Sequence, residues 1–341
     1  MYLPRHYSKQ KKRNFFQVRF LLIIILLTIA VFTFLYRKDI SRLFYSNRLA
    51  KISKLDEEIT QKNLSNQVNI QIFNKYTNMT LSFVESNPTN PTAYYLMAKS
   101  FYYKAIYEGM KFDVTNLVMF LSNNSIKIFQ DNPKLADYLE NMYQNAMKAR
   151  AFNPDFEYGF TNDFMIYLYQ VLKNQRDASY IDKEIIKIKY INLGPDFVSL
   201  YIWVGILNSA RAGNFDSLEK FLQINEKVKP EFKLTLNSRE VSFLKGYITF
   251  YLNDYITALN YFRESKANMD LITIEAIKKE AEIFYMQNLP KKSVKVLESL
   301  YMETGETDKQ ILLKIHFIQQ NRPGVSTVLQ KEIDNLEILE E

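Results

Sequence analysis

The strongest constraint on the fold is the spacing of apolar residues, which follows a helical period through nearly all of the chain after residue 41. The apolar runs end at Asn-Pro or Gly-Pro steps such as Asn153-Pro154 and Gly194-Pro195, where the residue before proline resists the helical region. Only eight of the 341 residues are glycine, too few for the turns of a hairpin-rich β protein. The sequence therefore predicts an all-α protein of helices joined by short turns.

The composition excludes several kinds of active site. The chain has no cysteine, which rules out a disulfide scaffold, a thiolate metal site and a cysteine nucleophile. Its two histidines are His6 and His316, and neither lies in a metal-binding or phosphate-binding motif. We therefore expect no catalytic residue, no cofactor and no metal.

The positive charge is concentrated at the start of the chain. Residues 1–19 carry six of the 44 basic residues and no acidic one, so 38 basic and 37 acidic residues follow them. A nucleic-acid-binding protein would carry its excess of positive charge on the folded body. We therefore expect no nucleic-acid partner and interpret residues 1–19 as a basic cytoplasmic tail.

An uncharged run of 17 residues follows at 20–36, FLLIIILLTIAVFTFLY. As a helix it is about 26 Å long, the short end of what crosses a bilayer core. Arg19 and Arg37 flank it, and no small-residue cleavage site follows, which favours a membrane helix over a signal peptide. Basic residues lie on both sides, so charge barely discriminates the orientation. The bulk of the chain follows the span, which favours a periplasmic or otherwise extracytoplasmic large domain.

A pattern recurs in the C-terminal part of the chain. Turns with glycine or asparagine at Gly213, Asn253 and Asn288 are followed five residues later by a small or apolar residue. The equivalent positions, 40, 35 and 34 residues apart, are Leu218, Ala258, Ser293 and Thr327. This pattern resembles the tetratricopeptide (TPR) repeat, a 34-residue helix-turn-helix unit whose second helix carries a small residue where it crosses the first.

The resemblance is best at 239–270 and implies a helical-hairpin solenoid. The residues that it assigns to packing within the repeat are Gly246, Tyr255, Ala258, Phe262 and Ser265. The unit at 199–230 has Ile206 where the family has a small residue. The expected organisation is the tail at 1–19, a transmembrane helix at 20–36, a juxtamembrane helix at 37–65, degenerate helical repeats at 66–195 and TPR-like repeats at 196–341.

The resemblance also implies a concave groove formed by the first helix of each repeat. The aromatic residues that it places in this groove are Tyr95, Tyr102, Tyr103, Trp203, Phe243, Tyr247, Phe250 and Tyr251. Such a groove suits an apolar or helical peptide. Carboxylate-clamp members of the family have Lys and Asn at the positions of Phe243 and Tyr247. This chain therefore lacks the residues of such a clamp. An open alternative is that a tightly wound superhelix, or the chain's own N-terminal helices, already fill the groove.

Together these features favour a non-catalytic, single-pass membrane scaffold of TPR-like repeats that binds other proteins of an envelope-associated assembly. Flagellar-motor collars, secretion complexes and cell-wall complexes are examples of such assemblies. Two alternatives stay open at this point. One is a membrane-anchored helical enzyme that acts on cell-wall glycan through an acidic cleft, and the other is an accessory subunit of a transporter.

Overall fold

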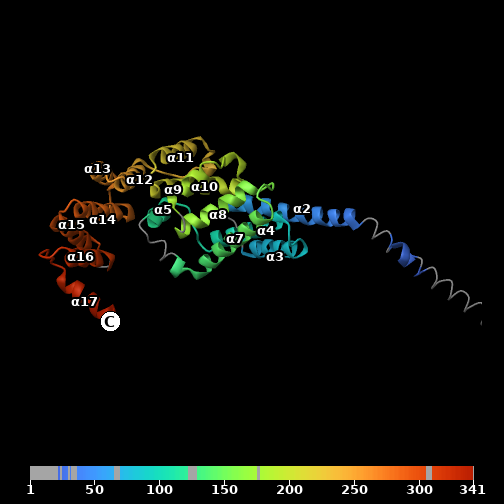
Figure 1. Ribbon diagram of the computed structural model, residues 1–341, viewed down its shortest axis with the longest axis horizontal. Helices are drawn as coiled ribbons and strands as arrows, with labels where there is room; N and C mark the ends of the chain where they lie inside the picture. The colour runs from blue at the N-terminus through green and yellow to red at the C-terminus, as the bar shows by residue number, and fades with distance from the viewer. Residues whose placement is uncertain are drawn as a thin grey trace, which may run out of the picture. The chain divides into compact units, whose positions relative to one another are not determined.

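A computed structural model describes residues 22–23, 25–29, 31, 37–64, 70–121, 129–174, 177–304 and 309–340. Throughout these ranges the regular structure is helical, with no β-strand (Figure 1), which confirms the all-α prediction. The predicted tail at 1–19 lies outside the described residues, as does most of the predicted span at 20–36. The chain divides into two compact units, Met1–Val68 and Asn69–Glu341.

The first unit contains the long helix α2 (Arg37–Leu64), in the range where the sequence predicts a juxtamembrane helix. Ile52, Leu55 and Ile59 of α2 are buried, and their spacing of three and four residues places them on one face of the helix. In the described ranges, no helix is both long enough and apolar enough to cross a membrane.

The first part of the second unit consists of irregularly connected helices. They are α3 (Ile70–Ser86), α4 (Pro91–Tyr107), α5 (Val114–Leu121), α7 (Pro133–Phe152), α8 (Gly159–Lys173), α9 (Ala178–Ile185) and the short 3₁₀-helix η1 (Tyr190–Asn192). Helix α4 packs between α3 and α7, and α8 joins α7 to α9 and α10. Helix α5 differs from these helices, because it packs against α10 and α14, which come much later in the chain.

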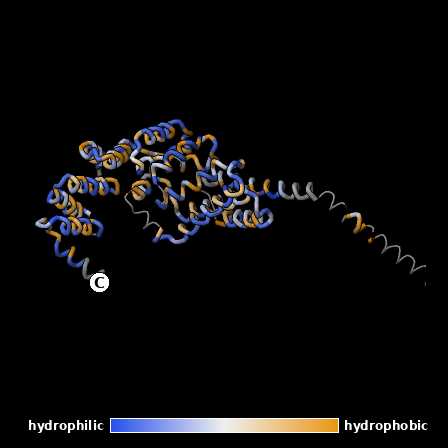
Figure 2. The backbone as a smooth tube through the Cα atoms, in the orientation of Figure 1, coloured by the Kyte–Doolittle hydropathy of each residue, from blue (hydrophilic) through white to orange (hydrophobic). Residues whose placement is uncertain are grey.

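The second part of this unit consists of consecutive helix pairs. Its helices are α10 (Pro195–Arg211), α11 (Phe215–Lys227), η2 (Pro230–Phe232), α12 (Ser238–Tyr251), α13 (Tyr255–Ser265), α14 (Leu271–Met286), α15 (Pro290–Glu303), α16 (Lys309–Asn321) and α17 (Gln330–Glu340). Each even-numbered helix packs against the next, odd-numbered helix. Hydrophobic and hydrophilic residues alternate along these helices (Figure 2), as expected for helices that bury one face.

The turns inside three of these pairs share one conformation. The residue just past the first helix has a positive φ: 64° at Gly213, 62° at Asn253 and 59° at Asn288. Glycine and asparagine are the residues that adopt this left-handed region most readily. In each turn the next N–H donates to the carbonyl five residues earlier, at 2.8–3.0 Å. The Gly and Asn residues of the sequence pattern therefore close the C-terminal ends of α10, α12 and α14.

Glycine at the helix crossings lets paired helices approach closely. A Cβ atom added to Gly246 of α12 would lie 2.9 Å from Cδ1 of Phe262 in α13, so the predicted packing role of Gly246 fits this geometry. In the preceding pair, a Cβ on Gly205 would lie 2.3 Å from Cε1 of Phe221. This unit therefore has a small residue at its helix crossing, although not at position 206 where the repeat pattern would place it. The repeat alignment at Ile206 is one residue too late, and Gly205 occupies the crossing.

The second helices of the pairs also bury equivalent positions. Three of the four predicted positions are fully buried, namely Leu218, Ala258 and Ser293. Thr327 is not equivalent to them, because it precedes α17 and its hydroxyl donates to Glu298 Oε1 at 2.6 Å. Among residues 330–335, the part of α17 whose side chains the structure describes, Ile333 is the buried one. The non-helical stretch after Asn321 lengthens this last repeat, so the predicted spacing of 34 residues fails there.

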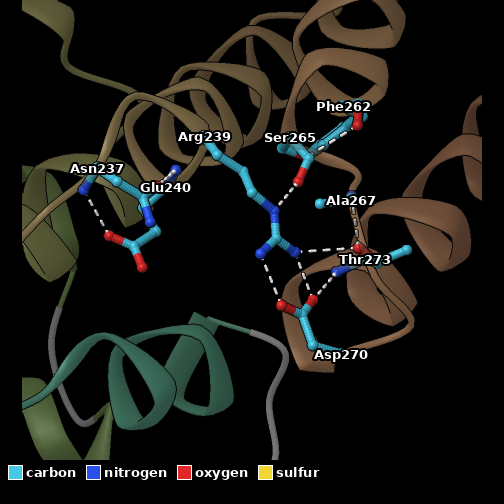
Figure 3. A network of polar contacts seen from close by, with 8 residues as sticks. All are labelled: Asn237, Arg239, Glu240, Phe262, Ser265, Ala267, Asp270 and Thr273. Atoms are coloured by element: carbon cyan, nitrogen blue, oxygen red, sulfur yellow. Dashed lines mark hydrogen bonds and ion pairs between the residues drawn. The ribbon is translucent and has the colours of Figure 1, made fainter.

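Arg239 joins the α12–α13 pair to α14, as Figure 3 shows. Its Nε donates to the carbonyl of Ser265 at 2.5 Å, its Nη1 to Asp270 Oδ2 at 2.6 Å, and its Nη2 to Thr273 Oγ1 at 3.0 Å. Asp270 also caps α14 by accepting from the N–H of Thr273. The hydrogen bonds from Arg239 hold the pKa of Asp270 at about 2. The buried Ser265 therefore contributes to the joint between pairs as well as to packing.

Two predicted packing residues complete the α12–α13 pair. Phe262 is fully buried beside the ring of Phe243, with ring centroids 5.8 Å apart. Tyr255 is only partly buried, and its hydroxyl donates to Asn253 Oδ1 at 2.9 Å. Tyr255 thus supports the turn at its edge, while Phe262 fills the space between the two helices.

Candidate functional site

Helix α5 occupies the side of the second unit formed by α10, α12 and α14. Its eight residues, VTNLVMFL, contain no charged side chain. Four of them are buried: Leu117, Val118, Phe120 and Leu121. Contacts join α5 to α10 and α14, and a hydrogen bond joins it to α12. We call the surface of α10, α12 and α14 that receives this helix the α5 groove.

The C-terminal end of α5 is held by side-chain donors of the groove. Arg211 donates through Nη2 to the carbonyl of Phe120 at 2.6 Å, and the hydroxyl of Tyr247 donates to the carbonyl of Leu121. The last carbonyls of a helix have no partner inside it. Arg211 also donates to the carbonyl of Val171 in α8 at 2.5 Å. Burial lowers the pKa of Arg211 and raises that of Tyr247, so both groups depend on these hydrogen bonds.

Trp203 of α10 holds the residues just before α5, Phe112 and Asp113. Its indole Nε1 donates to the carbonyl of Asp113, just before α5, at 2.8 Å. The rings of Phe112 and Phe120 lie edge-on to the indole, with centroid distances of 5.3 and 5.6 Å. Trp203 therefore contacts both ends of the segment, and its own side chain is fully buried.

A cation borders the groove on its α14 side. The Nζ of Lys279 lies 4.4 Å from the ring centroid of Phe250 and 5.2 Å from that of Tyr247. It also pairs with Glu282 at 2.9 Å. The hydroxyls of Tyr247 and Tyr251 lie 3.2 Å apart. These contacts are favourable electrostatically and link the end of α12 to α14.

Of the eight predicted groove residues, Trp203, Tyr247, Phe250 and Tyr251 lie in this region, and most of the eight are not exposed. Seven of the eight are buried: Tyr95, Tyr102, Tyr103, Trp203, Phe243, Tyr247 and Phe250. Tyr251 is 48% exposed. The prediction that all eight line an open surface is therefore wrong for the seven buried residues. The surface of α10, α12 and α14 is covered by α5, a helix from the middle of the chain, rather than by the N-terminal helices that the alternative named.

The three tyrosines of α4 that were predicted to line the groove, Tyr95, Tyr102 and Tyr103, pack inside the molecule rather than in the α5 groove. The ring of Tyr102 stacks on Phe197 of α10 with centroids 4.7 Å apart, and Tyr103 donates to Asp196 Oδ2 at 2.9 Å. Lys99 of α4 pairs with the same carboxylate at 3.2 Å. Tyr102, Tyr103 and Lys99 thus join α4 to the start of α10. Tyr95 instead stacks on Tyr158, just before α8, with ring centroids 4.7 Å apart. All four residues are buried.

An open cavity of about 280 Å³ lies between α14, α15 and α16. We call it the α14–α16 pocket. Tyr285 and Ile318 contribute to its mainly apolar wall, and Met286 and Phe317 are 53% and 54% exposed at its edge. Lys314 also lines it, and burial lowers the pKa of this amine. No sequence pattern predicted this pocket. A signal was present, because Met286 ends α14 just as the predicted groove residue Tyr251 ends α12.

The described residues offer little for metal or histidine chemistry. Among them, no group of three or more His, Cys, Asp or Glu side chains is arranged to hold a metal ion. His316 is partly buried on α16, where its Nε2 lies 2.7 Å from Nε2 of Gln320. The features that stand out among the described residues are therefore the filled α5 groove and the open, mainly apolar α14–α16 pocket.

A scan against protein-family models finds no match for the chain, and a search of curated proteins finds no similar sequence.

Proposed function

We propose that the chain is a membrane-anchored scaffold of TPR-like helix pairs that binds partner proteins. The observation that carries this proposal is that the first helices of successive pairs already form a groove that holds a helix, α5. Repeated turns at Gly213, Asn253 and Asn288, and glycine crossings at Gly205 and Gly246, support a TPR-like arrangement. Surfaces built by stacked helix pairs are a common basis for protein binding.

The α14–α16 pocket is the part of this surface where we place the partner. Exposed Met286 and Phe317 beside Tyr285 offer the adaptable and aromatic contacts that anchor binding partners. The wall of the pocket also carries the amines of Lys314 and Lys278 against one carboxylate, Glu282, which pairs with Lys279. A helix or peptide that inserts an apolar side chain and carries a neighbouring carboxylate suits this combination.

The membrane anchor and the extracytoplasmic location belong to the same proposal. The described residues of the 20–36 segment include seven exposed apolar side chains, at positions 22, 23, 25, 26, 27, 29 and 31. An apolar helix of this kind is stable in a lipid bilayer rather than in water. We place the large domain in the periplasm or an equivalent space, in an envelope assembly such as a flagellar-motor collar, a secretion complex or a cell-wall complex.

Site-specific photo-cross-linking in the source cells tests the partner site. A photoreactive phenylalanine at position 317 should give a discrete cross-linked product. The same group at Leu313, which is 45% exposed on α16 but does not line the pocket, is the matched control. Met286→Asp should abolish the product at 317 without loss of helical structure. Equal products at 313 and 317, or a product that survives Met286→Asp, would contradict the proposed site.

The anchor is tested separately by extraction and protease access. The chain should stay with the membrane after alkaline carbonate washing, and deletion of residues 20–36 should release it. Protease added to spheroplasts should digest the large domain and spare the tail. Release of the unaltered chain by carbonate would reject the anchor, and protection of the large domain would reverse its orientation.

A further inference from the structure

We infer that α5 is an internal ligand of the α5 groove and that an amphipathic partner helix binds there by replacing it. This inference rests on the proposed scaffold function and specifies the partner's chemistry. Its basis is that two side chains of the groove, Arg211 and Tyr247, donate to the carbonyls of Phe120 and Leu121 at the C-terminal end of α5, while Trp203 donates to the carbonyl of Asp113 just before the helix. Every helix ends in carbonyls that have no partner inside it, so Arg211 and Tyr247 are able to hold another helix end.

The groove also defines the side chains that the partner helix must carry. Leu117, Phe120 and Leu121 are buried at spacings of three and four residues, which places them on one face of α5. Thr115 on the same helix is exposed. A replacing helix therefore needs large apolar residues at positions equivalent to 117, 120 and 121, and it must end where Arg211 and Tyr247 reach its last carbonyls.

Removing α5 without replacement would be unfavourable. It would leave the part-buried guanidinium of Arg211 with only the carbonyl of Val171, and the hydroxyl of Tyr247 without the carbonyl of Leu121. Buried polar groups that lose their partners carry a large free-energy penalty. The groove therefore remains closed until another segment offers equivalent carbonyls. The apolar positions 117, 120 and 121, which lie on one face only in a helix, favour a helical partner over an extended peptide.

The size of α5 suits it to exchange. It has eight residues, whereas an isolated helix of this length is not stable in water. Its helical form therefore depends on the groove that holds it. The groove and the α14–α16 pocket share helix α14, so a partner bound at the pocket is well placed to present a helix to the neighbouring groove.

The test uses the full-length chain in detergent and a fluorescein-labelled synthetic peptide of residues 111–121 with an amidated C-terminus. Leu117→Asp puts a carboxylate on the buried face of α5 and weakens its docking. We expect the variant to bind the peptide about tenfold more tightly or better, because a closed site lowers the apparent affinity in proportion to its open fraction. Thr115→Asp, with the same added charge at an exposed position, should bind the peptide as the unaltered chain does.

Phe120→Ala is a milder second variant for the case that Leu117→Asp fails to fold. It removes the ring beside Trp203 and should also tighten peptide binding. Adding Tyr247→Phe to either variant should then weaken binding severalfold, since the peptide would lose a donor. Anisotropy gives the affinities, and circular dichroism checks the helical structure.

Unchanged peptide affinity in a folded α5 variant would overturn the inference, as would binding that is indifferent to Tyr247→Phe. Loss of folding in both α5 variants would overturn it too, because α5 would then be core that the fold requires. Cross-linking at position 317 does not depend on α5, so the proposed partner site and the exchange of α5 fail independently.

Discussion

The helices before α10 and the helix pairs from α10 onward use the same kind of turn but differ in which helix packs beyond it. Just past α4, Gly109 has a φ of 100°, and the N–H of Met110 donates to the carbonyl of Ala105, five residues earlier. After the equivalent turn at Gly213 the chain folds straight back into a packed second helix, α11. After Gly109, α5 packs against α10 and α14, while α7 packs against α4. The turn residue therefore determines where a helix ends but not which helix becomes its partner.

The largest expected effect tests whether close crossings hold the regular pairs together. Gly205→Ala should lower the free energy of unfolding by about 1–3 kcal/mol, since the new methyl group would overlap the buried ring of Phe221. Gly194→Ala is the matched control, because a Cβ there meets no atom within 4 Å. Urea denaturation of the full-length variants in detergent measures both changes. Equal effects at the two glycines would show that the α10–α11 crossing is not tightly packed.

A second prediction compares two tyrosine hydroxyls by the unfolding free energy that each contributes. One, on Tyr247, holds α5, and the other, on Tyr255, lies at the edge of a regular turn. Tyr247→Phe should lower the free energy of unfolding by about 1 kcal/mol, because the buried carbonyl of Leu121 loses its donor. Tyr255→Phe removes an exposed hydrogen bond to Asn253 and should have little effect. The same denaturation measurement applies. A larger loss for Tyr255→Phe than for Tyr247→Phe would contradict the role of Tyr247 in holding α5.

The third prediction concerns the pH dependence of the joint between pairs. Asp270 has a lowered pKa, about 2, so its ion pair with Arg239 stabilises the folded chain above the ordinary aspartate pKa of about 3.9. This stabilisation is lost as the pH falls through about 2. Because the Asp270 side chain is 43% exposed, we expect Asp270→Asn to cost only about 0.5–1 kcal/mol at pH 7.

The measurement is urea denaturation of both chains between pH 7 and pH 2, with the two unfolding free energies converging toward the acid end. Glu231→Gln is the control, since that carboxylate makes only an exposed contact with Lys229 at 4.0 Å. A difference that stays constant with pH would show that charge is not the basis of the effect of Asp270.

The smallest expected effect is a stabilisation at a turn. Asn288 has a positive φ of 59°, a conformation that favours glycine, so Asn288→Gly should raise the free energy of unfolding by about 0.5 kcal/mol or less. Gln287→Gly, one residue earlier where φ is −78°, should lower it, because glycine there adds only flexibility to the unfolded chain. Thermal melting of the two variants side by side distinguishes them.

The regular pairs could be predicted because their signals are local. A turn residue such as Asn253 and a small residue such as Ala258 lie five positions apart, so one sequence window contains both. Errors arose where such signals are displaced. Gly205 lies one position before the expected Ile206, and the non-helical stretch after α16 moves the last buried position from Thr327 to Ile333.

The candidate site was predictable only in part, because its occupant comes from a distant segment. The sequence analysis selected Trp203, Tyr247 and Tyr251 as groove residues, and all three lie along the α5 groove or at its edge. The hydrogen bonds that fill the groove join residues far apart in sequence, as from Trp203 to Asp113. An eight-residue apolar helix carries no signal for which distant surface it will cover.

The Arg239 contacts have a mechanical consequence for the groove. This side chain fixes the end of α13 to the start of α14 through a partly exposed ion pair, and exposed charges are screened by salt over about 8 Å at physiological ionic strength. Helix α5 contacts α10 on one side of this joint and α14 on the other. We therefore expect added salt to weaken this joint, which helps to fix the position of α14 and with it one wall of the groove.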